Sequence, residues 1–219
     1  MLVKAEHLQN QPKTNPCYKI TASLLNAWQD VLDSVEMVRE AEYDTICLED
    51  KKELKYEQEL KKFIDTLKRV PFTPTEAMIR GQEYEASVYR GEDSTFSPIV
   101  ENGAFQVSIR KNVVIDGVQI QLHGILDVLK ANHIYDIKRT GWYKYPKFKT
   151  SHQHSMYFEL VPEAMDFTYL ICDNDDMHYT EYVERCNSED IKKVISEFLE
   201  WLKINNLYEI YTQNWAINY

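Results

Sequence analysis

Three charged side chains stand inside two otherwise apolar segments of this sequence. The segments are GILDVL (124–129) and HIYDIK (133–138), and they carry Asp127, Asp136 and Lys138. Both segments have the length and composition of β-strands, and Lys138 follows Asp136 by two residues, so those two side chains project from one face. Paired carboxylates beside a lysine suit a divalent cation that holds a phosphate and the water that attacks it.

The distance between the two aspartates depends on how the segments pair. If Ala131-Asn132 forms a two-residue hairpin loop, Asp127 lies directly across from Asp136, with Cβ atoms roughly 5 Å apart. Two carboxylates that close repel each other and raise the pKa of one of them, unless Mg²⁺ or Mn²⁺ lies between them. The alternative is a pair of edge-strand aspartates that face solvent, and spacing alone does not decide between the two.

Helical patterns dominate the chain before these strands. Residues 1–18 are polar, contain two prolines and are predicted to be a loose arm. Thr21 is a suitable N-cap for a helix whose apolar residues recur at helical spacing. Residues 48–69 form a second, charged helix with one apolar side. Both helices belong to a helical part at 20–90.

A third helix is predicted from 74 to about 90. Thr73 is a candidate N-cap, Pro74 would occupy the first helical position, and Glu76 completes a capping box.

From residue 104 the apolar period changes to two. Alternating segments on either side of Asp116-Gly117 predict a β-hairpin, because Asp-Gly is a tight-turn dipeptide. The remaining predicted elements are a strand at 133–139, a short helix at 151–160, strands at 165–173 and 177–184, and a last helix at 188–205 capped by Ser188.

This order of elements favours a single domain of the α/β (α+β) class. A mixed central β-sheet would be flanked by helices, with an N-terminal helical segment and a sheet and catalytic core at 104–184. The length of 219 residues, with 44% hydrophobic and 27% charged, suits one folded core.

The net charge of −10 argues against a nucleic-acid partner, but the charge is unevenly distributed. Residues 173–200 hold nine acidic and three basic side chains, whereas 138–149 hold five basic side chains and no acidic one. The run KRTGWYKYPKFKT interleaves these bases with aromatic residues, a pattern typical of a grip on a nucleic-acid strand. A solvated loop with aromatic residues packed on the core is the alternative. The candidate phosphate contacts are Arg139, Lys144, Lys147 and Lys149.

Four motifs in a fixed order resemble the PD-(D/E)xK nuclease superfamily, and most closely its RecB-like branch, which includes phage exonucleases. The resemblance covers about 20 to 160, and ITASLLNAW is similar to the helix that opens such domains. The matching residues are Gly81 and Glu85 on a helix, Gly124 and Asp127 in a G-x-x-D strand, Asp136-Ile137-Lys138 in a D-x-K strand, and Gln153 and Tyr157 in Q-x-x-x-Y.

The resemblance implies a restriction-endonuclease-like core and a Mg²⁺- or Mn²⁺-dependent deoxyribonuclease, more specifically an exonuclease in recombination, repair or phage DNA processing. The implied metal ligands are Glu85, Asp127, Asp136 and the main-chain oxygen of Ile137. Lys138 would orient or help to deprotonate the nucleophile, and Gln153 and Tyr157 would contact DNA or hold the site in shape.

Other expectations concern cofactors and partners. Some RecB-like relatives carry four cysteines that bind an iron–sulfur cluster. Here Cys172 and Cys186 are too few and too far apart, so no cluster is expected. The expected partners are DNA and a recombination, helicase or annealing protein. A homo-oligomer is compatible with the resemblance. No signal peptide or membrane span is recognisable, which predicts a cytoplasmic protein of a bacterial or phage-infected cell.

Two alternatives to an active nuclease stay open at this point. One is a non-catalytic DNA-binding or regulatory protein that kept the fold, and the other is a nuclease subunit that is active only in a complex. His123, His152 and His154 are either ligands at the site or polar packing residues.

Overall fold

The computed structural model describes residues 16–41 and 49–217. Within these ranges the chain forms seven strands, seven α-helices and one 3₁₀ turn, which confirms the predicted mixed α/β class. The helices are α1 (Ala22–Ala41), α2 (Glu49–Leu67), α3 (Glu76–Tyr89), α4 (Ser97–Val100), α5 (His152–Leu160), α6 (Ile191–Ile204) and α7 (Tyr208–Trp215). The strands are β1 (Cys17–Ile20), β2 (Ala104–Ile115), β3 (Val118–Lys130), β4 (His133–Arg139), β5 (Asp166–Cys172), β6 (His178–Glu184) and β7 (Ala216–Ile217).

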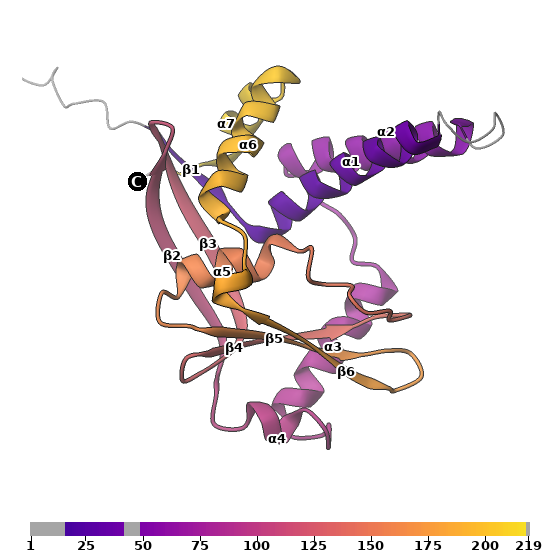
Figure 1. Ribbon diagram of the computed structural model, residues 1–219, viewed down its shortest axis with the longest axis vertical. Helices are drawn as coiled ribbons and strands as arrows, with labels where there is room; N and C mark the ends of the chain where they lie inside the picture. The colour runs from indigo at the N-terminus through magenta and orange to yellow at the C-terminus, as the bar shows by residue number, and fades with distance from the viewer. Residues whose placement is uncertain (1–15, 42–48, 218–219) are drawn as a thin grey trace, which may run out of the picture.

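The long strand β3 organises the sheet, whose order is β6-β5-β4-β3-β1-β7, with β2 also paired to β3 (Figure 1). One edge of β3 pairs with β2 along its length. The other edge is shared: β1 pairs in parallel with 119–122, and β4 pairs antiparallel with 128–130. On that second edge, no strand of the described chain pairs with residues 123–127. We call this opening the notch.

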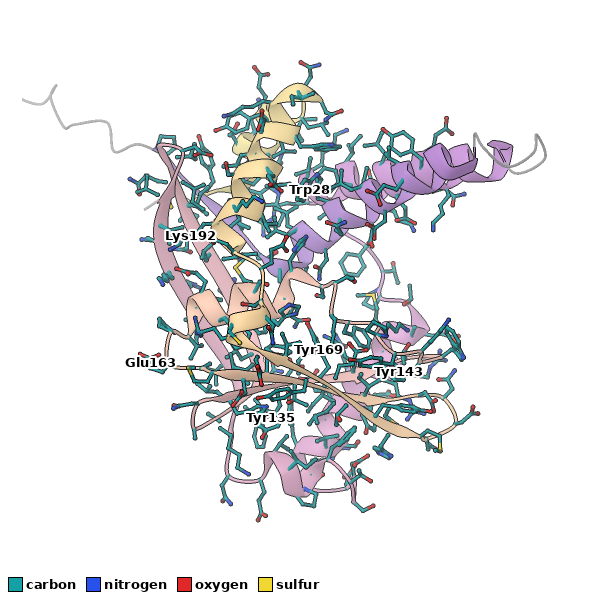
Figure 2. The ribbon with its side chains drawn as sticks, viewed as in Figure 1. Trp28, Tyr135, Tyr143, Glu163, Tyr169 and Lys192 are labelled. Carbon is teal, nitrogen blue, oxygen red and sulfur yellow. The ribbon has the colours of Figure 1, made fainter. Side chains whose placement is uncertain are left out.

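Helices cover both faces of the sheet. The larger apolar cluster lies beneath α1, α2, α5, α6 and α7, and a smaller one lies beneath α3 and α4 (Figure 1). Trp28 packs from α1 against Phe198 of α6, with ring centroids 5.5 Å apart (Figure 2). Strand β5 alternates between the clusters, since Tyr169 packs in the larger one and Leu170 in the smaller. A strand covered on both faces requires a nearly continuous apolar sequence, as in DFTYLIC.

Strand β3 turns over at Asp127. Residues two apart on a strand normally share a face, yet Leu126 packs in the larger cluster and Val128 in the smaller. The position opposite Asp127 on β2 is Gln106, whose φ of 52° departs from the extended conformation. The turnover puts Asp127 between the two helical layers.

The predicted hairpins, β4 and the short helix α5 are confirmed, with two helix starts corrected. Helix α3 begins after Thr75, not Thr73, because the Thr75 hydroxyl accepts the N–H of Met78 at 3.3 Å. Helix α6 begins after Asp190, whose carboxylate accepts the N–H of Lys192 at 3.0 Å. The hydroxyl of Ser188 instead donates to a carbonyl of the preceding 3₁₀ turn.

Four elements were not predicted: β1, α4, α7 and β7. The interpretation of 1–18 as a loose arm is wrong for Cys17 and Tyr18, which belong to β1, while 1–15 lie outside the described residues. The helix at 188–205 is not the last one, because α7 and β7 follow it. In the part of the chain that the structure describes, no helix has both the length and the apolar character of a membrane span.

Candidate active site

Asp127 lies at the notch, where β3 and β4 separate. The pairing of Val128 with Tyr135 has the predicted register, and this pair is the last of the ladder before the two aspartates. One step further, Oδ2 of Asp127 accepts the main-chain N–H of Ile137 at 2.9 Å. A side-chain carboxylate therefore takes the place of a strand partner for that N–H group.

The electrostatic environment of Asp127 disfavours its negative charge. Burial and the neighbouring charge of Asp136 raise its pKa to about 8, Glu85 adds to this, and Lys138 opposes it. When nearby carboxylates keep a carboxyl group protonated, a cation placed among them stabilises its ionised form. The predicted closeness of the two aspartates thus appears in the structure as a raised pKa of Asp127.

Asp136 is completely buried and is held by two side chains. Its Oδ2 forms an ion pair with Nζ of Lys138 at 2.6 Å, and its Oδ1 accepts a hydrogen bond from Nε2 of Gln153. Burial lowers the pKa of Lys138, but the charges of Asp136 and Asp127 outweigh this and raise it. Lys138 is therefore an ammonium group that neutralises the aspartates.

Helix α5 supplies a chain of hydrogen bonds that fixes this arrangement. Ser151 caps the helix by accepting the N–H of Gln153. Gln153 donates to Asp136 and also to the Tyr157 hydroxyl at 3.2 Å, and Tyr157 donates to the carbonyl of Ile125 at 2.7 Å. Tyr157 is buried, so it anchors α5 to the unpaired edge of β3.

Gly124 explains how closely α5 approaches β3. A Cβ atom at this position would lie 2.7 Å from both Cδ1 of Leu160 and Cε1 of Tyr157. These distances are too short for carbon atoms, so only glycine fits without moving the helix. The glycine of the G-x-x-D motif is therefore required by packing.

Glu85 approaches from the opposite face, on α3. Its carboxylate accepts hydrogen bonds from the Tyr89 hydroxyl and from the Gln106 amide. Tyr89 also lies 3.2 Å from the main-chain oxygen of Asp127 and so links α3 to the notch. Neither Tyr89 nor Gln106 was predicted. The spacing of four between Glu85 and Tyr89 on one helix was a usable signal for the first, and the sequence holds none for Gln106.

A cavity of about 630 Å³ opens beside Lys138, on the side of the sheet that α1 and α5 cover. Its walls come from the start of α1, the unpaired edge of β3, and the side chains of Lys138 and Gln153. Asn26 and Asp30 line it from α1, and Asn26 also donates to the Ser151 hydroxyl at 3.0 Å. The first helix, predicted only as a framework element, thus forms one wall of the site.

The predicted phosphate contacts fall into different surroundings. Arg139 lies on the opposite face of β4 from Lys138, where it pairs with Asp176 at 2.8 Å. The Lys147 ammonium donates to the carbonyl of Trp142 at 2.9 Å. Lys144 and Lys149 are exposed. Arg139 and Lys147 therefore already bind oxygen atoms of the protein.

The three candidate histidines lie in different surroundings. His152 and His154 are buried, and burial together with His152 lowers the pKa of His154 to about 4. His154 Nδ1 lies 3.0 Å from the hydroxyl of Tyr169, which points from β5 toward α5 (Figure 2). These two are packing residues. His123 lines the cavity and lies 3.1 Å from the Ser108 hydroxyl.

The comparisons with known proteins speak to the fold. No family model matches the chain, and no curated protein matches its sequence. Among solved structures, the chain is similar to the crystal structure of SSO0001, with a TM-score of 0.52 and 15% sequence identity. The similarity covers 90% of this chain and 81% of that one, so the architecture is shared over nearly the whole domain.

Proposed function

We propose that this protein is a divalent-metal-dependent deoxyribonuclease, and more specifically an exonuclease. The observation that carries the proposal is the carboxylate pair at the notch, half-buried Asp127 and buried Asp136, with Lys138 beside it at the wall of an open cavity. The resemblance of these residues to the PD-(D/E)xK motifs supports the same conclusion.

The donor atoms fit Mg²⁺ or Mn²⁺. In the described ranges no three Asp, Glu, His or Cys side chains form a group able to hold a metal ion, so the proposed ligands include a main-chain atom. The two aspartates and the main-chain oxygen of Ile137 would hold the cation. Glu85, which Tyr89 and Gln106 already bind, would contact it through water. All are hard oxygen donors. When bound, the metal activates water for attack on the phosphodiester and neutralises the developing charge.

The other residues of the site neutralise the phosphate charge or hold the site in shape. Lys138 is paired with Asp136 and carries a positive charge, so it suits an electrostatic partner of the scissile phosphate, and it would also orient or help to deprotonate the attacking water. Its present partner is Asp136; a bound cation would offset the charge of that carboxylate, and the Lys138 ammonium would then be free to contact the phosphate. Gln153 and Tyr157 are positioning residues, because their hydrogen bonds end on Asp136 and on the backbone of β3.

A digestion time course tests the proposal. Wild type, Asp136→Asn and the control Asp176→Asn are incubated with linear and covalently closed circular DNA, in Mg²⁺, Mn²⁺ or EDTA. Asp176 is a surface partner of Arg139 and lies outside the notch. We expect metal-dependent loss of linear DNA alone, abolished only by Asp136→Asn. Cleavage of the circle would make the protein an endonuclease, and activity in Asp136→Asn would refute the site.

A second candidate is a DNA-binding protein without activity. It is favoured by the fact that Asp136 already has both oxygens engaged, by Lys138 and Gln153, without any metal. Calorimetry separates the two, because this candidate predicts no Mg²⁺ or Mn²⁺ binding in the millimolar range or below.

A further inference from the structure

The loop that joins β4 to α5 begins and ends at the candidate site. We call residues 140–151 the β4–α5 loop. It follows Lys138 and Arg139 at the end of β4, and it precedes Gln153 on α5. Both ends of the loop therefore adjoin the residues of the notch.

Buried hydrogen bonds hold the loop in place. Glu181 of β6 is fully buried, and its carboxylate accepts the main-chain N–H groups of Lys147 at 2.6 Å and Phe148 at 3.0 Å. The side chain of Lys147 closes the loop on itself through Thr140 and the carbonyl of Trp142. A loop fixed in this way loses little conformational entropy when it binds a ligand.

The four aromatic residues of the loop divide into two pairs. Tyr143 packs on Tyr179 of β6 with ring centroids 4.6 Å apart (Figure 2), and Phe148 packs on Tyr169 at 5.4 Å. These two rings anchor the loop to the sheet.

The other pair faces solvent: Trp142 is 69% exposed and Tyr145 is 58% exposed. Two large rings on a fixed loop, next to the exposed Lys144 and Lys149, form a surface for planar, negatively charged ligands. The Lys149 ammonium already lies 5.1 Å from the centre of the Tyr145 ring.

The part of α1 that faces the loop is negatively charged. A smaller cavity of about 270 Å³ separates Lys138 and Lys147 from Asp30 and Asp33 of α1. Burial, with Glu59 and Asp33, raises the pKa of Asp30, which marks this wall as a crowded acidic surface. Phosphates are attracted to the side of Lys138 and Lys147 and repelled from the side of Asp30 and Asp33. The exposed rings of Trp142 and Tyr145 stack on bases that are not paired, so the loop favours a single strand over a duplex.

We infer that the β4–α5 loop is a platform for single-stranded nucleic acid. Bases stack on Trp142 and Tyr145, and Lys144 and Lys149 contact the phosphates on either side. The inference rests on the proposed function, since it names the substrate form that reaches the notch. The binding itself needs neither metal nor cleavage.

Tryptophan fluorescence provides a direct readout. Of the four tryptophans, Trp28 and Trp215 are buried and Trp201 is half-buried, so Trp142 is the one with a freely accessible ring. The full chain in EDTA is titrated with a 12-residue oligo-dT, with its duplex, and with an abasic strand of equal length. We expect oligo-dT to quench the fluorescence. The abasic strand and the duplex are expected to bind more weakly.

Variants assign the effect to the two rings. Trp142→Ala and Tyr145→Ala are each expected to weaken oligo-dT binding about 5- to 100-fold, measured by anisotropy of a labelled strand. Trp142→Phe keeps a stacking ring, so it should bind nearly normally while losing the quenching. Two controls should bind like wild type: Ile204→Ala, which truncates a side chain of similar exposure (71%) on α6, and Trp201→Phe, which also keeps the quenching.

The outcomes separate this inference from the proposed function. Equal binding of oligo-dT and the abasic strand, or normal binding by Trp142→Ala, overturns the platform. Quenching without metal-dependent cleavage keeps the platform and refutes the nuclease. Cleavage that is indifferent to both loop variants keeps the nuclease and refutes the platform.

Discussion

The carboxylate of Asp127 accepts the main-chain N–H of Ile137 across the gap between β3 and β4, at 2.9 Å. This contact joins two strands after their ladder has ended. A carbonyl and an N–H of one strand residue point to the same side, so the main-chain oxygen of Ile137 is directed toward the same gap. In a continuous ladder, the N–H and C=O groups of Ile137 would form hydrogen bonds with β3. Because the strands separate here, the Asp127 carboxylate and the Ile137 carbonyl lie at the same gap.

Metal binding and stability should depend oppositely on pH through Asp127. In the unfolded chain this carboxyl group titrates at 3.8, whereas in the folded protein its pKa is about 8. Its stabilising contribution is full below pH 4 and is lost as the pH rises to 8. In EDTA, urea unfolding should give a lower free energy at pH 8 than at pH 5, and Asp127→Asn should reduce this difference. A difference unchanged in Asp127→Asn would contradict the assignment.

Mg²⁺ must displace the proton from Asp127, so its affinity should increase up to about pH 8. Calorimetry at pH 7 in two buffers with different ionisation enthalpies measures the proton that is released. Equal apparent enthalpies in both buffers would mean that Asp127 is already ionised.

Lys138→Met should destabilise the metal-free protein by about 3 kcal/mol, because Asp136 is then left buried and unpaired. Urea unfolding of Asp136→Asn, Lys138→Met and the double variant forms a cycle. The double variant should be more stable than the sum of the single effects predicts. Simple additivity would show that the ion pair contributes nothing.

Gly124→Ala should cost about 1–3 kcal/mol and reduce cleavage, because the added methyl group pushes Tyr157 and α5 away from β3. Gly81→Ala is the matched control. No atom lies within 4 Å of a Cβ there, and alanine in a helix interior should stabilise by about 0.5–1 kcal/mol. Thermal unfolding and the digestion assay give both readouts. A Gly81→Ala protein that is stable but inactive would assign that glycine to substrate approach.

Tyr89→Phe should weaken Mg²⁺ binding about tenfold, since the hydroxyl holds Glu85 and reaches the backbone at Asp127. Tyr84→Phe is the control on the same helix, because its hydroxyl donates to Asp93 at 2.8 Å, outside the notch. Both should lose about 1 kcal/mol of stability. Similar metal affinities in the two variants would limit Tyr89 to a role in packing.

The sequence by itself determined the elements that depend on neighbouring residues. The period of two and Asp116-Gly117 predicted β2 and β3, and the two-residue loop at 131–132 predicted the register of β4 with β3. The predicted short helix carries Gln153 and Tyr157 four residues apart, and both side chains reach the notch. Two helix starts were wrong, because several neighbouring Thr, Ser and Asp residues are each suitable N-caps.

Tertiary structure alone decided what those elements do together. Strand β1 pairs with β3 across some hundred residues of sequence, and where it ends the notch begins. The turnover at Asp127, the support of Glu85 by Gln106, and the pairing of Arg139 with Asp176 on the other face arise from packing two helical layers on one sheet. Local patterns encode which face a side chain occupies along its own strand. Only the folded sheet decides where two strands separate, because that depends on pairings between distant segments.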